Sequence, residues 1–170
     1  LLRKQAKSKV LKPLVVFTPK SLLRHSEAKS LKKEFFSGEF LPVLDDATEK
    51  ENVETLILTF GKIFYDLKKF KIDNSINGVA IIRIEQFYPF PEDELIKIIN
   101  SYPNVSEIRF VQEEPENMGV QNYMKIRMIK NKYEIKYYAR SESSSPAPGS
   151  YKIYEDTQNE LISGVFENVN

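Results

Sequence analysis

Cysteine is absent from this chain of 170 residues, and histidine occurs only once, as His25. Without cysteine the chain has no disulfide, no thiolate metal site and no cysteine nucleophile. A single histidine leaves no histidine-based metal site, so we assign no metal ligand. No apolar run approaches the roughly 18 residues of a membrane helix, and no signal-peptide pattern opens the chain. The ordinary hydrophobic (41%) and charged (29%) fractions indicate one globular domain.

The glycine-rich signatures of nucleotide and hydrolase sites are also missing. The sequence contains neither G-x-G-x-x-G nor G-x-S-x-G. Gly61-Lys62 follows an apolar segment, but the upstream glycine of a phosphate-binding loop is not there. We therefore assign no catalytic residue to this chain.

Negative charge is scarce near the N-terminus. Residues 1–33 contain ten Lys or Arg against one acid, a net charge of +9, whereas residues 34–170 contain fifteen against twenty-three, a net charge of −8. Such a basic end can meet an acidic surface of the same protein, a phosphorylated small molecule or nucleic acid. No nucleic-acid recognition motif accompanies the charge, so we expect no nucleic-acid partner.

The apolar segments alternate as short strands and helices, which predicts an α/β domain with a mainly parallel sheet and helices on both faces. The predicted strands are Leu14–Phe17, Phe40–Leu44, Glu54–Phe60, Gly78–Ile84, Glu107–Val111 and Ile135–Ala139. Helices are predicted over residues 2–9, 61–70, 91–101, 119–130 and 155–167, with a helical turn over 21–25.

Polar residues follow the first predicted strand. The fully apolar run Leu14–Phe17 is typical of a strand buried on both faces, and Pro19 ends it. Polar groups just beyond the carboxyl end of such a strand lie where α/β proteins bind ligands. The candidates for an anion or regulator site are Lys12, Lys20 and Arg24. His25 is either an acid–base or hydrogen-bonding group or, as we favour, a structural residue.

Two further polar groups follow later strands. Glu113 and Glu114 would share a proton, hold a hard cation, bind an arginine or, as we favour, hydrogen-bond a neighbouring loop and helix N-terminus. Arg83 would meet an anion or, as we favour, pair with Glu85, Glu113 or Glu114.

The Lys12–His25 block resembles the segment that opens the C-terminal domain of the thiamine-diphosphate-dependent decarboxylase (first) component of the 2-oxoglutarate dehydrogenase complex. Five further segments match that family in its order: Leu2–Gln5, Gly61–Leu67, Arg83–Gln86 with Pro89–Pro91, Gln112–Pro115 with Asn117, and Arg140 with Ser143, Ser145, Pro146, Ala147 and Gly149. Tyr154 departs from this pattern because it stands where the family has a histidine, so the resemblance carries no role to that position.

The resemblance implies a transketolase C-terminal-domain-like fold with a mainly parallel five-stranded sheet. Residues 1–11 would then be the end of a preceding helix, and residues 12–170 the domain. The parent enzyme would decarboxylate 2-oxoglutarate on thiamine diphosphate and Mg²⁺, bound outside this segment, and pass the succinyl group to lipoamide in the tricarboxylic acid cycle. Leu1 in place of methionine fits a piece of a longer or processed protein. The domain alone would be inactive.

The implied partners are the upstream catalytic domains, a homodimer partner and the dihydrolipoyl succinyltransferase of the complex. Acetyl-CoA or AMP is the implied regulator near the basic cluster. The remaining candidates form an interface or structural polar cluster, namely His25, Arg83, Gln112, Glu113, Glu114 and Arg140. A stand-alone binding or dimerisation module, a 2-oxoadipate dehydrogenase and a 2-oxoglutarate decarboxylase are the alternatives. We expect a bacterial cytoplasm or a mitochondrial matrix, and no membrane partner.

Overall fold

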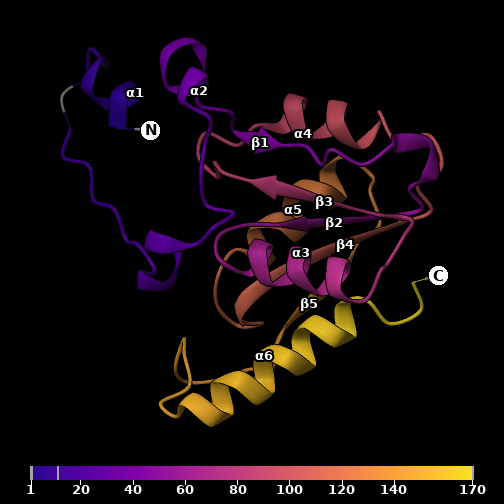
Figure 1. Cartoon of the computed structure of the whole chain (residues 1–170). Helices are drawn as coiled ribbons and strands as arrows, with labels where there is room; N and C mark the ends of the chain where they lie inside the picture. The colour runs from indigo at the N-terminus through magenta and orange to yellow at the C-terminus, as the bar shows by residue number, and fades with distance from the viewer. Residues whose placement is uncertain (1, 11, 170) are drawn as a thin grey trace. The chain divides into compact units, whose positions relative to one another are not determined.

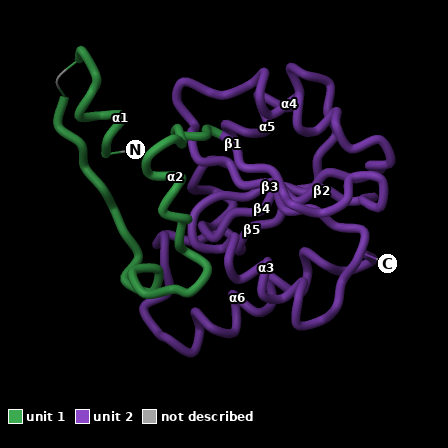
Figure 2. The backbone as a smooth tube through the Cα atoms, turned by 45° about the horizontal axis from the view of Figure 1, so that its top comes forward, with its two compact units in different colours: residues 1–42 green, residues 43–170 purple. Residues whose placement is uncertain are grey.

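The chain divides into two compact units, Leu1–Pro42 and Val43–Asn170, which Figure 2 colours green and purple. The computed structural model describes residues 2–10 and 12–169. The predicted domain boundary after residue 11 falls at a position outside the described residues, and it stays a prediction. Among the described residues, no helix has the length and apolar composition that crossing a bilayer requires.

The first unit has three short helical segments: α1 (Leu2–Ala6), η1 (Lys20–Arg24) and α2 (Lys32–Ser37). Glu34 holds the start of α2, because its carboxylate accepts a hydrogen bond from the backbone N–H of Leu31 at 2.7 Å. None of the described residues before position 43 is buried. This unit therefore has no hydrophobic core of its own.

The prediction of a buried strand at Leu14–Phe17 is wrong. Residues 12–19 form neither helix nor strand, and the Phe17 side chain is 94% exposed. A strand is buried only when neighbouring strands take up its backbone groups, and every described strand comes from residues 43–140. Lys20 and Arg24 consequently do not follow a strand of the sheet.

The second unit is built on a five-stranded sheet with the order β1-β3-β2-β4-β5 (Figure 1). Strands β2, β3, β4 and β5 are parallel, and the two-residue β1 pairs antiparallel with β3. The strands are β1 (Val43–Leu44), β2 (Thr55–Thr59), β3 (Val79–Ile84), β4 (Glu107–Pro115) and β5 (Lys136–Arg140). The 3₁₀ turn η2 (Lys50–Asn52) precedes β2. The mainly parallel five-stranded sheet is confirmed.

Helices cover both faces of this sheet, as predicted. They are α3 (Ile63–Asp73), α4 (Glu92–Ile99), α5 (Gln121–Lys130) and α6 (Tyr151–Val165). Side chains alternate along a strand, so each strand serves two cores. Leu56 and Leu58 of β2 pack in the core beneath α4 and α5, whereas Ile57 packs in the core beneath α3 and α6.

The predicted elements of the second unit form, with shifted ends. Strand β1 is shorter than the predicted Phe40–Leu44, and β4 continues four residues past Val111. Helix α6 begins at Tyr151 rather than at Glu155. The ends of elements are what local sequence pattern predicts least well.

Candidate functional site

The topology defines one position where an α/β sheet is expected to bind ligands. The chain leaves the neighbouring strands β2 and β4 in opposite directions along the sheet, because β2 continues through α3 to β3 and β4 continues through α5 to β5. The crevice outside the carboxyl ends of two such strands is the preferred ligand site of open parallel sheets. Here it lies between the residues that follow Thr59 and the end of β4.

Side chains of the protein itself meet at this crevice. The Lys62 ammonium donates to the Tyr154 hydroxyl of α6 at 2.5 Å, and that hydroxyl donates to Glu113 Oε1 of β4 at 3.1 Å. Lys62 also lies 3.8 Å from Glu113 Oε1 and 3.2 Å from Asp66 Oδ2. We call Lys62, Asp66, Glu113, Arg140, Tyr154 and Gln158 the edge cluster. The hydrogen bonds and ion pairs among these residues tie β4, α3 and α6 together.

Arg140 extends the edge cluster to the end of β5. Its terminal Nη2 donates to Gln158 Oε1 and lies 3.7 Å from Glu113 Oε1, while its guanidinium stacks 4.9 Å from the Tyr154 ring. Gln158 in turn donates to Asp66 Oδ2 at 3.0 Å. Arg140 is 9% exposed, so a buried guanidinium is held by one carboxylate, one amide and one aromatic face.

The pKa of Lys62 is raised. Burial by itself lowers the pKa of an ammonium, but the hydrogen bond to Tyr154 and the carboxylates of Glu113 and Asp66 outweigh that effect. Lys62 therefore stays charged throughout the physiological range. A lysine in this state is an ion-pair partner rather than a base or nucleophile.

Gln112 explains the loop that follows β4. This fully buried amide donates to the backbone carbonyls of Pro115 and Met118 at 3.0 and 2.9 Å. Its oxygen accepts from the backbone N–H groups of Val120 and Gln121 at 3.1 and 2.9 Å. One side chain thus satisfies both the loop and the start of α5, which is a structural role.

The loops beyond β4 and β5 are also joined. Asn117 donates from Nδ2 to the Ser143 carbonyl at 2.9 Å and accepts from the Ser143 N–H at 3.2 Å. The backbone N–H of Glu116 donates to the Arg140 carbonyl at 2.9 Å. These contacts hold the segment 141–150 against the carboxyl edge of the sheet.

The structure gives the two predicted carboxylates different surroundings. Glu113 joins the edge cluster, while Glu114 Oε2 is buried and has no hydrogen-bond partner among the described residues. Arg83 pairs with Glu85 at 2.5 Å, as we favoured, and it also donates to the Tyr65 hydroxyl at 3.1 Å. Its guanidinium lies 4.6 Å from the Phe64 ring.

The basic candidates all belong to the first unit. Lys12, Lys20 and Arg24 are exposed. His25 is half-buried, and its Nδ1 accepts a hydrogen bond from the Glu27 N–H at 3.2 Å. A regulator role for these residues stays a prediction.

Four members of the edge cluster were not among the predicted site residues: Lys62, Asp66, Tyr154 and Gln158. The place of Lys62, just after a predicted strand and Gly61, could have marked it as a site residue. The sequence around Tyr154 and Gln158 does not mark these residues, because α6 reaches the carboxyl edge of the sheet only through tertiary packing.

These observations define a class of protein: an α/β module with a mainly parallel sheet, whose switch-point crevice is filled by its own ion pairs. The family described as 2-oxoglutarate dehydrogenase C-terminal matches residues 29–166. The chain is 38% identical, over 175 aligned residues and 99% of its length, to the 2-oxoglutarate dehydrogenase E1 component of Staphylococcus aureus strain JH9. The protein of the same name from strain Newman matches equally well.

The chain belongs to the 2-oxoglutarate dehydrogenase C-terminal family. It spans about a fifth of the length of the curated relatives it matches, 19% of each. The predicted resemblance and the predicted fold are both confirmed.

Proposed function

We propose that this chain is the C-terminal domain of a 2-oxoglutarate dehydrogenase and that it serves assembly rather than chemistry. The parent enzyme would decarboxylate 2-oxoglutarate and pass the succinyl group to lipoamide. The observation that carries the assembly role is the exposed apolar segment Leu14–Phe17. Val15, Val16 and Phe17 are 71%, 58% and 94% exposed, a pattern that marks a surface to be covered.

The filled crevice supports the same role. The side chains at the switch point hydrogen-bond to one another, and the raised pKa of Lys62 keeps it paired with carboxylates. A site occupied in this way stabilises the edge of the sheet instead of receiving a substrate.

We assign the cofactors of the parent enzyme, thiamine diphosphate and Mg²⁺, to its upstream domains. Among the described residues no group of three or more His, Asp or Glu would hold a metal ion, so these residues do not fit Mg²⁺. The proposed partners are the upstream catalytic domains, a second copy of the enzyme and the dihydrolipoyl succinyltransferase. The proposed location is the cytoplasm of a bacterium or the mitochondrial matrix of a eukaryote.

Hydrogen exchange on this chain and on the parent enzyme tests the assembly role. Residues 14–17 should exchange freely in the chain alone and become protected in the parent enzyme. Phe17→Ser should leave the unfolding temperature of the chain unchanged and lower the activity of the parent enzyme. Ile129→Ser, at a 73% exposed position of α5, is the matched control and should lower neither.

Equal exchange in both proteins, together with full activity of Phe17→Ser, would contradict the assembly role. The sequence upstream of Leu1 is a separate test of the parent. A missing thiamine-diphosphate motif there would favour a stand-alone binding module. Turnover of 2-oxoadipate, or release of a free aldehyde, would favour one of the sister enzymes.

A phosphate-bearing regulator is the second candidate function. Lys12, Lys20 and Arg24 are exposed, and none of them forms an ion pair with a described carboxylate, so their charges are available to an anion. Millimolar acetyl-CoA or AMP should then raise the unfolding temperature of the chain. Lys20→Ala should abolish this shift, and Lys97→Ala, on α4, should keep it. If neither ligand raises the unfolding temperature of the chain or of the parent enzyme, the regulator role is wrong.

A further inference from the structure

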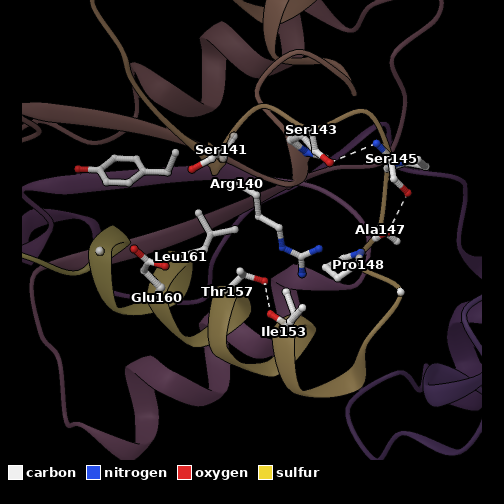
Figure 3. A pocket seen from close by; sticks show the side chains of 16 residues that line it. Arg140, Ser141, Ser143, Ser145, Ala147, Pro148, Ile153, Thr157, Glu160 and Leu161 are labelled. Carbon is white, nitrogen blue, oxygen red and sulfur yellow. Dashed lines mark hydrogen bonds between the residues drawn. The ribbon is translucent and has the colours of Figure 1, made fainter.

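A pocket of about 560 Å³ lies beside α6, and all of its lining residues belong to the second unit. The segment 141–150 forms one wall, α6 the opposite wall, and the end of β5 the base (Figure 3). This volume is within the range of small-molecule sites. The contacts between Asn117 and Ser143 hold the outer wall in place, so the pocket is built into the fold.

The lining of this pocket is mostly apolar. Pro115, Pro146, Pro148, Ala147, Ile153 and Leu161 supply the apolar surface. Ile153 is 55% exposed although it belongs to the first turn of α6, because the pocket beside it is open. An apolar body would therefore find surface to cover there.

One charged group reaches into this apolar space. Arg140 is more than nine-tenths buried, and in Figure 3 its side chain projects from β5 toward Ile153 and Pro148. Its Nε is buried and has no hydrogen-bond partner among the described residues. The guanidinium hydrogen-bonds one described acceptor, Gln158 Oε1, through Nη2. A buried guanidinium with unused donors calls for an explanation.

The lining of the pocket carries charges of both signs. Glu160 lines the pocket two helical turns after Ile153, and in Figure 3 it lies apart from the Arg140 guanidinium. The hydroxyls of Ser141, Ser143 and Thr157 add further polar atoms to the lining. An anionic head would be attracted to Arg140 and repelled from Glu160, which orients an elongated ligand.

We infer that this pocket binds a small organic anion, with its carboxylate or phosphate on Arg140 and its apolar tail along Ile153 and Leu161. The planar guanidinium matches such an oxyanion, and an apolar tail supplies most of the contact area. The lining of this site contains none of the basic candidates Lys12, Lys20 and Arg24, and the proposal does not depend on the assembly role proposed above.

The experiment is a titration of the ¹⁵N-labelled chain by NMR with three probes: hexanoate, hexanamide and inorganic phosphate. Hexanoate should shift the amides of residues 140–161 saturably, with a Kd in the range of about 1–10 mM that suits so small a ligand. Hexanamide, which keeps the tail and lacks the charge, should bind at least about tenfold more weakly. Phosphate, which keeps the charge and lacks the tail, should bind weakly too.

Two variants separate the head from the tail. Arg140→Gln should reduce hexanoate affinity to that of hexanamide. Gly164→Leu fills the pocket from α6, where a Cβ meets no atom within 4 Å, and should block both ligands without touching Arg140. Since Gly164→Leu leaves the edge cluster intact, it keeps the test decisive if Arg140→Gln does not fold.

Equal binding of hexanoate and hexanamide would overturn the anion assignment. Absence of any saturable shift with hexanoate would overturn the site. If Gly164→Leu leaves hexanoate binding unchanged, the ligand binds elsewhere, and the assignment of this pocket is overturned as well.

Discussion

At the scale of single residues, this domain is organised by polar side chains that act as structural hubs. Gln112 and Tyr154 each join elements that are distant in the sequence. Gln112 lies in a segment that the sequence marks as polar, and its burial follows from its place on a central strand. Tyr154 could not be predicted, because its role depends on where α6 packs.

The Tyr154 hydroxyl should control the titration of Lys62. Tyr154→Phe removes the hydroxyl that accepts from Lys62, so the pKa of Lys62 should fall and the free energy of unfolding should drop by about 1 kcal/mol. NMR titration of the Lys62 ammonium measures the pKa. Tyr151→Phe, at an exposed position three residues earlier, is the control and should change neither quantity.

The sign of the pH dependence follows from the raised pKa. Because Lys62 binds its proton more tightly in the folded state, its stabilisation is complete below pH 10.5 and is lost as the pH rises through the higher folded-state value. Urea unfolding measured below pH 10.5 and at rising pH above it should show a smaller loss in Tyr154→Phe than in the unchanged chain. Equal losses of unfolding free energy in the two proteins would contradict the coupling between Tyr154 and Lys62.

Removal of the Gln112 amide should be costly. Gln112→Ala leaves the N–H groups of Val120 and Gln121 without their acceptor, and it opens a cavity at a fully buried position. The free energy of unfolding should fall by about 3 kcal/mol. Asn159→Ala, on the exposed side of α6, should change it by less than about 0.5 kcal/mol. Urea denaturation of both variants decides whether Gln112 is the hub that its contacts indicate.

At the scale of elements, two glycines should respond oppositely to the same substitution. Gly164 lies inside α6 with free space around its Cβ position, whereas Gly119 has φ +68° and a Cβ there would lie 2.7 Å from Gln112 Oε1. The first conformation suits alanine, and the second belongs to the left-handed region that L side chains avoid. The amide of Gln112 is held in place, because it hydrogen-bonds to five backbone groups.

Gly164→Ala should raise the free energy of unfolding by about 1 kcal/mol, the difference in helix propensity. Gly119→Ala should lower it by about 2 kcal/mol because of backbone strain and the contact with Gln112. Thermal unfolding of both variants measures the difference. A stabilised Gly119→Ala would show that the loop after β4 adapts more readily than its hydrogen bonds indicate.

At the scale of the whole molecule, the two units should differ in stability. Among the described residues all the buried side chains lie in the second unit. The first unit holds no core, so it should open locally at little cost in free energy. This difference in stability is expected if the first unit is stabilised by packing against another protein surface, as the assembly role requires.

Limited trypsin digestion of the chain should therefore cut first among the basic residues before position 43. The fragment that remains should begin near β1 and keep an unfolding temperature within a few degrees of that of the intact chain. Mass spectrometry of the fragment and calorimetry check both outcomes. Cleavage that starts within residues 43–169 would contradict the assignment of the core.

The sequence alone determined the α/β class, the order of the strands and helices after position 40, and the family. Short apolar runs fix local structure, and five ordered motifs fix a resemblance. Only the tertiary structure showed that Leu14–Phe17 is exposed, because the hydrophobicity of a segment does not determine which surface it packs against. It also decided the edge cluster and the pocket beside α6, since both depend on side chains from elements that meet only after the sheet has formed.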